Sequence, residues 1–298
     1  MLVIGSTQAV NILISVFRMK VLAVLLGPGG VGLLSIYNNL QGMVQQTAGL
    51  GMDSSGVREI ASSRGEEQTL SRVRRVLLVA HIVQGALSML AVWVLREQIA
   101  VWLFGDAVRA TEVGLIGVAI LLSLLAAAQT ALLQGMRRIA DLGRVTVIGA
   151  LVGTVAGLMA VWAKGEGGLI WFVLMQPLGA VLVAFHCTRR LPKPVAARLS
   201  LADVWQVWKP MAKLGFAFMM GGLATTATLL IVRGRISQEL GLDAAGHFAA
   251  SWSITMTYVG FLLGAMGADY YPRLTEVIHD RLAAVQLMND QAQLGLAI

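Results

Sequence analysis

Long, nearly uninterrupted apolar stretches are the feature that most constrains how this chain can fold. A helix that crosses a bilayer needs about 20 mostly apolar residues, and eight stretches of that kind occur in the 298 residues. A transmembrane β-barrel is excluded, because its strands would read as short segments of alternating polarity. The eight stretches lie near residues 3–26, 31–52, 75–95, 113–135, 145–163, 168–187, 211–232 and 244–268. We therefore predict an all-α fold, a polytopic membrane bundle of about eight transmembrane helices.

Composition and the placement of charge support the same class. The chain is 57% hydrophobic and only 13% charged, which is too apolar for one soluble globule of this length. Most of the 23 lysines and arginines lie in the connections after the second, fourth, sixth and eighth stretches. By the positive-inside rule these connections are cytoplasmic, as are both termini. The net charge of +7 thus reflects membrane orientation, and nucleic acid is not an expected partner.

The stretches fall into an expected order of lobes. Residues 1–190 hold six helices and form a complete N-terminal lobe, and residues 191–208, which include Leu191-Pro192-Lys193-Pro194, read as a basic cytoplasmic linker. Residues 209–298 would hold the first two helices of a second lobe and an amphipathic helix at the inner membrane surface. That helix would present Leu274, Ile278, Leu282 and Val285 on one face. Leu294 to Ile298 resemble the start of a ninth span, so we expect a shortened chain.

Charged residues recur with similar spacing in the two predicted lobes. One pattern of two basic residues between apolar ones occurs twice, 215 positions apart, as Phe17-Arg18-Met19-Lys20-Val21 and as Val232-Arg233-Gly234-Arg235-Ile236. Asp53 follows Arg18 by 35 residues, and Asp269 follows Arg233 by 36. The register of these charges predicts two related halves.

Polar residues form stripes along several apolar helices. Gln8, Asn11, Ser15 and Arg18 recur at helical spacing on the first stretch. A charge at membrane depth is costly and usually faces a cavity or a partner. The stripes therefore predict a hydrated cleft, in which a guanidinium would grip phosphate oxygens and amides would meet sugars. The expected substrate-binding residues are Arg18, Asn11, Gln8, Gln41, Gln45 and Arg233.

Each of these residues has a simpler alternative role. The amides could bond one helix to another, and Arg233 could anchor the outer end of its helix. Asp53 and Asp269 are candidates for coupling or gating, and ion pairs at helix ends with Arg58 and Arg273 are the alternative. His81 lies well inside a predicted span, and a hydrogen bond between helices is the alternative to a functional role for it.

No motif for catalysis or cofactor binding is expected to operate. Gly27-Pro28-Gly29-Gly30-Val31-Gly32 matches a dinucleotide fingerprint in letters, but it lies between two membrane helices, without a strand, and reads as a tight turn. The four histidines lack metal-ligand spacing, and the single cysteine, Cys187, excludes an internal disulfide. We predict a protein that is not an enzyme and has neither a cofactor nor a bound metal.

The chain resembles a known family in several segments. Arg18 to Leu33, Gly49-Leu50-Gly51-Met52, Val57-Arg58-Glu59-Ile60-Ala61 and Tyr270-Tyr271-Pro272-Arg273-Leu274-Thr275 are similar to Wzx-type O-antigen translocases. These polysaccharide-export flippases belong to the same superfamily as the multidrug MATE transporters and the lipid II flippase.

The resemblance implies two six-helix lobes around a central cavity that opens to either side of a bacterial inner membrane in turn. The implied cargo is an undecaprenyl-diphosphate-linked oligosaccharide, and the implied partners are membrane lipids, a polysaccharide polymerase and chain-length machinery. Arg18 stands where lipid II flippases carry a cavity arginine that meets the diphosphate. Gln45 and Gln46 are amides where those relatives carry arginines, which argues against lipid II itself.

Two alternatives remain open at this point. A MATE-like exporter of organic cations would call for an acidic residue deep in a helix. A membrane scaffold of glycan assembly would bind partners without moving lipid.

Overall fold

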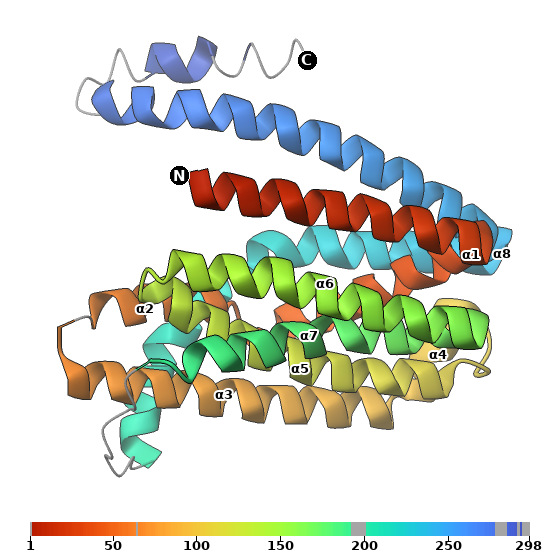
Figure 1. The fold of residues 1–298 in the computed structure, drawn as a ribbon, viewed down its shortest axis with the longest axis horizontal. Helices are drawn as coiled ribbons and strands as arrows, with labels where there is room; N and C mark the ends of the chain where they lie inside the picture. Colours follow the sequence, from red (N-terminus) through yellow and green to blue (C-terminus); the bar gives the residue numbers. More distant parts are fainter. Residues whose placement is uncertain (1, 64, 192–200, 278–284, 291–292, 294–298) are drawn as a thin grey trace. The chain divides into compact units, whose positions relative to one another are not determined.

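The described part of the chain is built from helices and contains no strand. The computed structural model describes residues 2–63, 65–191, 201–277, 285–290 and 293. The elements are α1 (Leu2–Gly49), α2 (Met52–Ser62), α3 (Glu67–Val94), α4 (Arg96–Phe104), α5 (Ala110–Gly135), α6 (Ile139–Lys164), a 3₁₀ turn η1 (Gly165–Gly168), α7 (Leu169–Thr188) and α8 (Leu201–Val277) (Figure 1). The prediction of an all-α polytopic bundle is confirmed.

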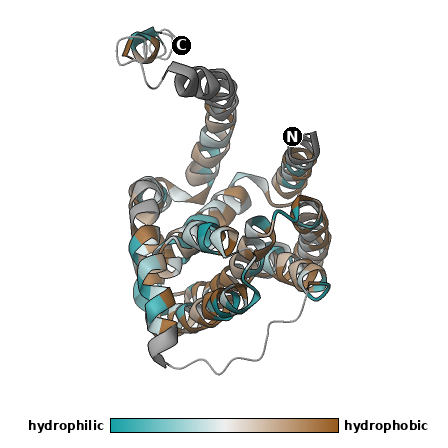
Figure 2. Ribbon diagram, turned by 90° about the vertical axis from the view of Figure 1, so that its left-hand side faces the viewer, coloured by the Kyte–Doolittle hydropathy of each residue, from teal (hydrophilic) through white to brown (hydrophobic). Residues whose placement is uncertain are grey.

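The helices divide into two compact units. The first comprises residues 1–248, and the second comprises residues 249–298. Figure 2 views the helices of the first unit nearly end-on, as a bundle without a sheet. The second unit holds the remainder of α8 and a short helical stretch at 285–290. Of the expected linker, residues 192–200 lie outside the described residues and 201–208 begin α8; the centre of the expected surface helix, 278–284, and the expected ninth span at 294–298 also lie outside.

Within the described residues, four segments are long and apolar enough to cross a membrane. They are Val10–Gly49, Glu67–Val94, Ala110–Gly135 and Ile139–Thr188. The first and the last are 40 and 50 residues long, about twice what one crossing needs, and each is interrupted, at Gly27 and at η1 respectively. These segments account for the first six predicted crossings. The last two predicted crossings lie within α8.

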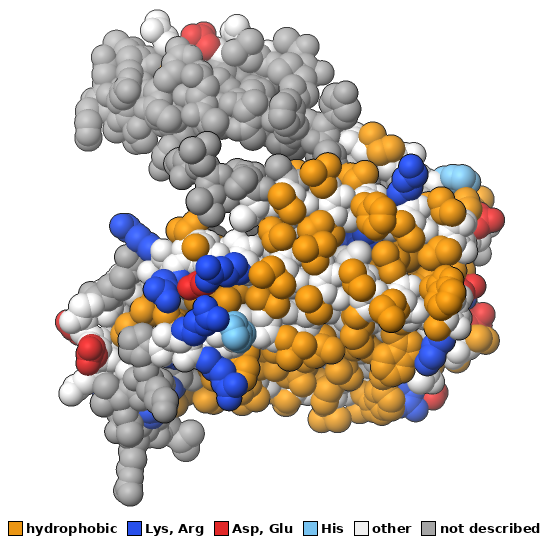
Figure 3. Space-filling model, viewed as in Figure 1, with side chains coloured by type: hydrophobic (Ala, Val, Ile, Leu, Met, Phe, Trp, Pro, Cys, Tyr) orange, Lys and Arg blue, Asp and Glu red, His pale blue; other side chains and the backbone are white. Residues whose placement is uncertain are grey.

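The surface of the bundle carries an apolar belt. On the face shown in Figure 3, hydrophobic side chains cover the middle and charged side chains gather toward the two ends. On α6, Val155, Met159 and Trp162 are exposed, Trp162 by 80%. So many exposed apolar side chains are favourable in contact with lipid and unfavourable in contact with water. The protein is therefore a multi-pass membrane protein.

Two breaks in the long helices have the same backbone conformation. Gly27 interrupts α1 at φ 68° and ψ −169°, and Gly241 interrupts α8 at φ 86° and ψ 172°. Both conformations are open to glycine and strained for other residues. Arg18 precedes the first break by nine residues, and Arg233 precedes the second by eight. The expected turn at Gly27 is thus a single non-helical residue, and Pro28 starts the following helix, a position that proline favours.

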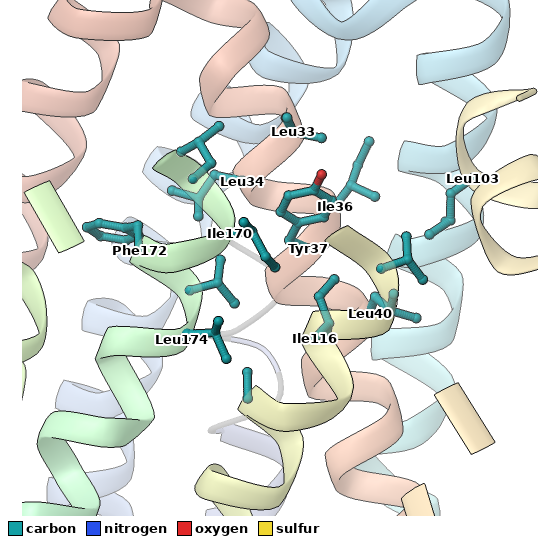
Figure 4. Close-up of a cluster of buried hydrophobic side chains, with 14 of the residues drawn as sticks. Leu33, Leu34, Ile36, Tyr37, Leu40, Leu103, Ile116, Ile170, Phe172 and Leu174 are labelled. Carbon is teal, nitrogen blue, oxygen red and sulfur yellow. The ribbon is translucent and has the colours of Figure 1, made fainter. Parts of the chain in front are cut away.

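The first unit has two clusters of buried apolar side chains. One joins Leu33, Ile36 and Tyr37 of α1 to Ile116 of α5 and Phe172 of α7, as Figure 4 shows. The other includes Met52 and Ile60 of α2, Leu77 of α3, Leu132 of α5 and Ala184 of α7. Along α1 the last fully buried member of the first cluster is Leu40, although the partly buried Met43, Val44 and Ala48 also pack against it, and the second cluster begins with Met52 just after the helix. The stretch of α1 between them, which carries Gln45 and Gln46, contributes no fully buried member to either cluster.

A tight turn between α1 and α2 packs directly on α8. Leu50 and Gly51 both have positive φ, 50° and 62°. A Cβ added to Gly51 would lie 2.1 Å from the carbonyl oxygen of Gly215, and a Cβ on Gly215 would lie 2.2 Å from that of Leu50. Only glycine fits at either side of this contact, which fixes the end of α1 against α8.

We predict that Gly51→Ala lowers the stability of the protein much more than Gly27→Ala. Both substitutions place a Cβ on a backbone with positive φ, at a cost of about 1–3 kcal/mol, but Gly27 has open space around it and Gly51 meets the Gly215 carbonyl. Thermal unfolding of the two variants in detergent measures the difference. Equal losses would contradict the packing described here.

Candidate functional site

Close packing of α6 on α7 builds the surroundings of Arg18. Gly149, Gly153 and Gly157 recur every fourth residue on α6, and Cβ atoms added to them would lie 3.0, 2.8 and 2.5 Å from atoms of α7. Such small residues let membrane helices approach closely. At Gly153 the nearest atoms belong to Met175 and Gln176. Gln176 is therefore held against α6, and its Nε2 donates to Oγ1 of the buried Thr154 at 3.4 Å.

The guanidinium of Arg18 is bonded to this glutamine. Its Nη1 donates to Oε1 of Gln176 at 3.1 Å, and Nη2 donates to Oγ of Ser15 at 3.3 Å. The guanidinium carbon lies 5.8 Å from the centre of the Phe172 ring, within the range of a cation–π contact. Arg18 is half-buried and is tied to α7 through its side chain.

All of these partners of Arg18 are neutral. No carboxylate lies within ion-pair distance of it among the described residues. A guanidinium cannot lose its proton in a protein, so its positive charge remains uncompensated. An arginine held in this way at membrane depth can attract an anionic group, and phosphate oxygens match its paired N–H donors.

A polar hollow of about 400 Å³ lies elsewhere in the first unit. It lies beside the stretch of α1 that separates the two apolar clusters. A second hollow of about 270 Å³ shares Asp53, Ser54 and Ala127 with it. The polar side chains that line the larger hollow are Gln45, Gln46, Asp53, Ser54, His81 and Thr226.

The two glutamines in this hollow differ in how they are bonded. Gln46 accepts a hydrogen bond from Oγ1 of Thr226 at 3.2 Å and donates to the carbonyl oxygen of Met219 at 3.5 Å. It is thus anchored to α8. Gln45 has no hydrogen-bond partner among the described residues, so its amide is available to a ligand.

Asp53 and His81 add a carboxylate and an imidazole to the lining of the larger hollow. Asp53 begins α2, where a carboxylate suits the helix dipole, and it is exposed. Within the described residues it makes no ion pair with Arg58, the alternative role considered from the sequence. His81 of α3 is 0% exposed, and its Nδ1 lies 2.8 Å from the carbonyl oxygen of Leu77 in its own helix. Its Nε2 has no partner in the described structure, so the expected bond between helices is not seen there.

The other predicted site residues are not gathered at the hollow. Gln41 donates to Oγ of Ser123 at 2.8 Å, a bond from helix to helix. Arg233 is 8% exposed, and its Nη1 donates to the carbonyl oxygen of Ser35 at 3.3 Å. Asn11 is half-buried on α1. The side chains of Gln8 and Asp269 lie outside the described residues, and Arg18 lines neither hollow.

Several residues of the site were not predicted from the sequence. The signal for Gln176 was present, since it is an amide in an otherwise apolar helix facing a series of glycines at every fourth position. Gln46 and His81 were noted in the sequence but were not among the expected substrate-binding residues, and their place at the hollow, like that of Thr226, depends on contacts between helices far apart in the chain.

A comparison with known families assigns the chain. The family model described as polysaccharide biosynthesis protein matches residues 1–278. The chain belongs to the polysaccharide biosynthesis protein family. The resemblance inferred from Arg18 to Leu33 and the later segments is thereby confirmed at the level of the family.

Two curated proteins are similar to this chain, and both are lipid III flippases. The lipid III flippases of Escherichia coli (strain K12) and Shigella flexneri are each 26% identical to it over 274 residues. The match covers 88% of this chain and 63% of each relative, so the chain spans less than two thirds of their length. No solved structure matches the chain significantly.

We predict that Arg18 and Gln176 are energetically coupled. Gln176→Leu removes the acceptor of Arg18 and should cost about 1–3 kcal/mol, but less when Arg18 is already methionine. Unfolding free energies of the wild type, both single variants and the double variant give a coupling of about 0.5–2 kcal/mol. The lost bond to Thr154 cancels in this cycle, so strict additivity would show that the Arg18–Gln176 hydrogen bond contributes nothing.

Proposed function

We propose that the protein translocates lipid-linked oligosaccharides across the bacterial inner membrane by alternating access, with both termini in the cytoplasm. The cargo is an undecaprenyl-diphosphate-linked O-antigen or a related polysaccharide repeat unit. The protein acts as a transporter and not as an enzyme. A polysaccharide polymerase and chain-length machinery are the partners that would take the product on the far side.

The observation that carries this proposal is a polar hollow within the membrane bundle of a polysaccharide biosynthesis family member. Contact with lipid gives no reason for amides, a carboxylate and an imidazole inside a helical bundle. Burying such groups there costs free energy unless they form hydrogen bonds. A hydroxyl-rich cargo that passes through the bundle supplies bonds for them. The names of the relatives at 26% identity agree with a lipid-linked substrate.

Arg18 is the proposed contact for the diphosphate. Gln176 and Ser15 hold its guanidinium without neutralising it, so its charge is available to the phosphates. Asn11, one helical turn away from Ser15, and the unbonded Gln45 are proposed contacts for the rest of the head group. Asp53 and Asp269 remain proposed coupling or gating residues, and Arg233 a proposed second cation for the cargo.

A second function is favoured by one specific observation. The hollow contains the carboxylate of Asp53, and its lining within the described part of the chain includes no lysine or arginine, which also suits an organic cation. Growth of an expressing strain on cationic drugs tests this function. Resistance that is lost in Asp53→Asn, without any movement of lipid-linked glycan, would favour a cation exporter.

We predict that Arg18→Ala lowers the rate of glycan flipping about 10- to 100-fold, because a hydrogen-bonded charge pair to phosphate is lost. The assay follows a fluorescent undecaprenyl-diphosphate-linked glycan in proteoliposomes. Lys20→Ala is the matched control, since Lys20 is an exposed cation two residues along the same helix. A wild-type protein that moves no glycan contradicts the proposed function, and full activity in Arg18→Ala removes Arg18 from the site.

We predict further that Gln176→Glu reduces flipping as strongly as Arg18→Ala. The substitution keeps the shape of the side chain but places a carboxylate where the amide oxygen lies 3.1 Å from Arg18, so that the arginine is neutralised within the protein. Gln176→Leu, which adds no charge, should have a smaller effect. The same proteoliposome assay compares the two variants, and an unaffected Gln176→Glu protein would show that the charge of Arg18 is not used.

A further inference from the structure

The chemistry of the hollow is unlike that of Arg18. Its polar lining offers a carboxylate, two amides, a serine and a threonine hydroxyl, and an imidazole, and no lysine or arginine belongs to it among the residues that the structure describes. A phosphate group would meet the negative charge of Asp53 there without a cation to offset it. The hollow is therefore poorly suited to the diphosphate of a lipid carrier.

The groups that lack partners in and beside the hollow are mostly hydrogen-bond acceptors. His81 donates from Nδ1 to the Leu77 carbonyl oxygen, so a neutral ring presents Nε2 as an acceptor, and this atom has no partner in the described structure. Next to it on α3, Oε1 of Gln84 is also buried without a partner there. Asp53 offers only acceptors when it is ionised. Such a wall calls for a ligand that brings O–H or N–H donors.

Two of the polar groups that line the hollow already have hydrogen-bond partners. Thr226 bonds both Oε1 of Gln46 and the carbonyl oxygen of Gly222, and Gln46 reaches the Met219 carbonyl oxygen. The uncommitted groups, Gln45, Asp53 and His81, thus lie on α1, α2 and α3. With a volume of about 400 Å³, the hollow falls within the range of small-molecule sites, about 300–1,000 Å³.

We propose that this hollow is a sugar subsite that accepts an uncharged or amino sugar of the cargo and discriminates against an acidic sugar, with Asp53 as the discriminating residue. The proposal rests on the proposed function, since it concerns the head group of the same cargo. Hydroxyl and amide N–H groups of the sugar donate to Asp53 and His81, and the amide of Gln45 takes a further hydroxyl. A sugar carboxylate would lie close to the carboxylate of Asp53, and the repulsion between the two negative charges would weaken its binding.

Two synthetic probes test the proposal with the full chain in nanodiscs. Both are short-chain polyprenyl diphosphates that carry the same neutral oligosaccharide spacer, which ends in N-acetylglucosamine in one probe and in glucuronic acid in the other, and their dissociation constants are measured by isothermal titration. We expect the wild type to bind the neutral probe at least about fivefold more tightly than the acidic one. Asp53→Asn should abolish this preference, mainly by strengthening binding of the acidic probe.

The controls separate the sugar from the diphosphate. Glu59→Gln makes the same charge change on α2 at a residue outside the lining of the hollow, and it should leave the preference intact. Arg18→Ala should weaken both probes alike. His81→Leu should weaken the neutral probe about 3- to 10-fold, and His186→Leu, at an exposed histidine of α7, should not.

Each failure has its own meaning. A wild type that binds neither probe overturns the proposed function and this proposal with it. Binding of both probes with equal affinity, unchanged in Asp53→Asn, overturns the sugar subsite alone and leaves the proposed function standing. Asp53 is exposed, so Asp53→Asn tests the proposal even if His81→Leu does not fold.

Discussion

An arginine inside a membrane bundle must be bonded, and this constraint organises the site. Arg18 meets it through Gln176, a residue 158 positions away in the chain. That contact requires α7 to lie at the right depth and rotation, which the packing of Gly149, Gly153 and Gly157 determines. A single charge thereby ties α1 to α7, and the glycines of α6 hold α7 in place.

The neutrality of these partners gives the arrangement its chemical meaning. An ion pair would have satisfied Arg18 fully and left it inert toward a ligand. Elsewhere in the first unit such a pair does form, since Asp141 bonds both Arg138 and Arg144 at the start of α6. Arg18 is held by an amide, a hydroxyl and an aromatic face, so it is fixed in position but keeps its attraction for an anion. The acid of Asp53 stands in a separate hollow, and the two charges do not cancel.

The membrane-spanning helices of the protein could be predicted from the sequence. Long apolar stretches enter the membrane, and there the cost of unpaired backbone groups in lipid requires them to be helical. The eight predicted stretches are almost wholly helical, apart from the turn at Leu50 and Gly51 near the end of the second, and the glycine at 27 does interrupt α1. The surroundings of Arg18 could not be predicted in the same way. Arg18 lines neither hollow, because it is bonded to Gln176; the amide is visible in the sequence of an apolar helix, but its pairing with Arg18 depends on how α6 and α7 pack.

The hollow shows the same division. Gln45 is among the residues that line the hollow, on the helical face that Gln41 and Gln45 mark in the sequence. Gln41 shares that face but bonds Ser123 of α5, a contact that periodicity cannot foresee. His81 was expected to bond a neighbouring helix, yet it bonds Leu77 of its own helix. Periodicity locates a face of a helix, and the identity of the facing side chain decides whether that face is used for packing or for a ligand.

A crystal structure of the protein with a short-chain polyprenyl diphosphate linked to N-acetylglucosamine would test the central claim most directly. The account predicts phosphate oxygens within hydrogen-bond distance of the Arg18 guanidinium. A diphosphate bound away from Arg18, with the guanidinium still bonded only to Gln176 and Ser15, would contradict it.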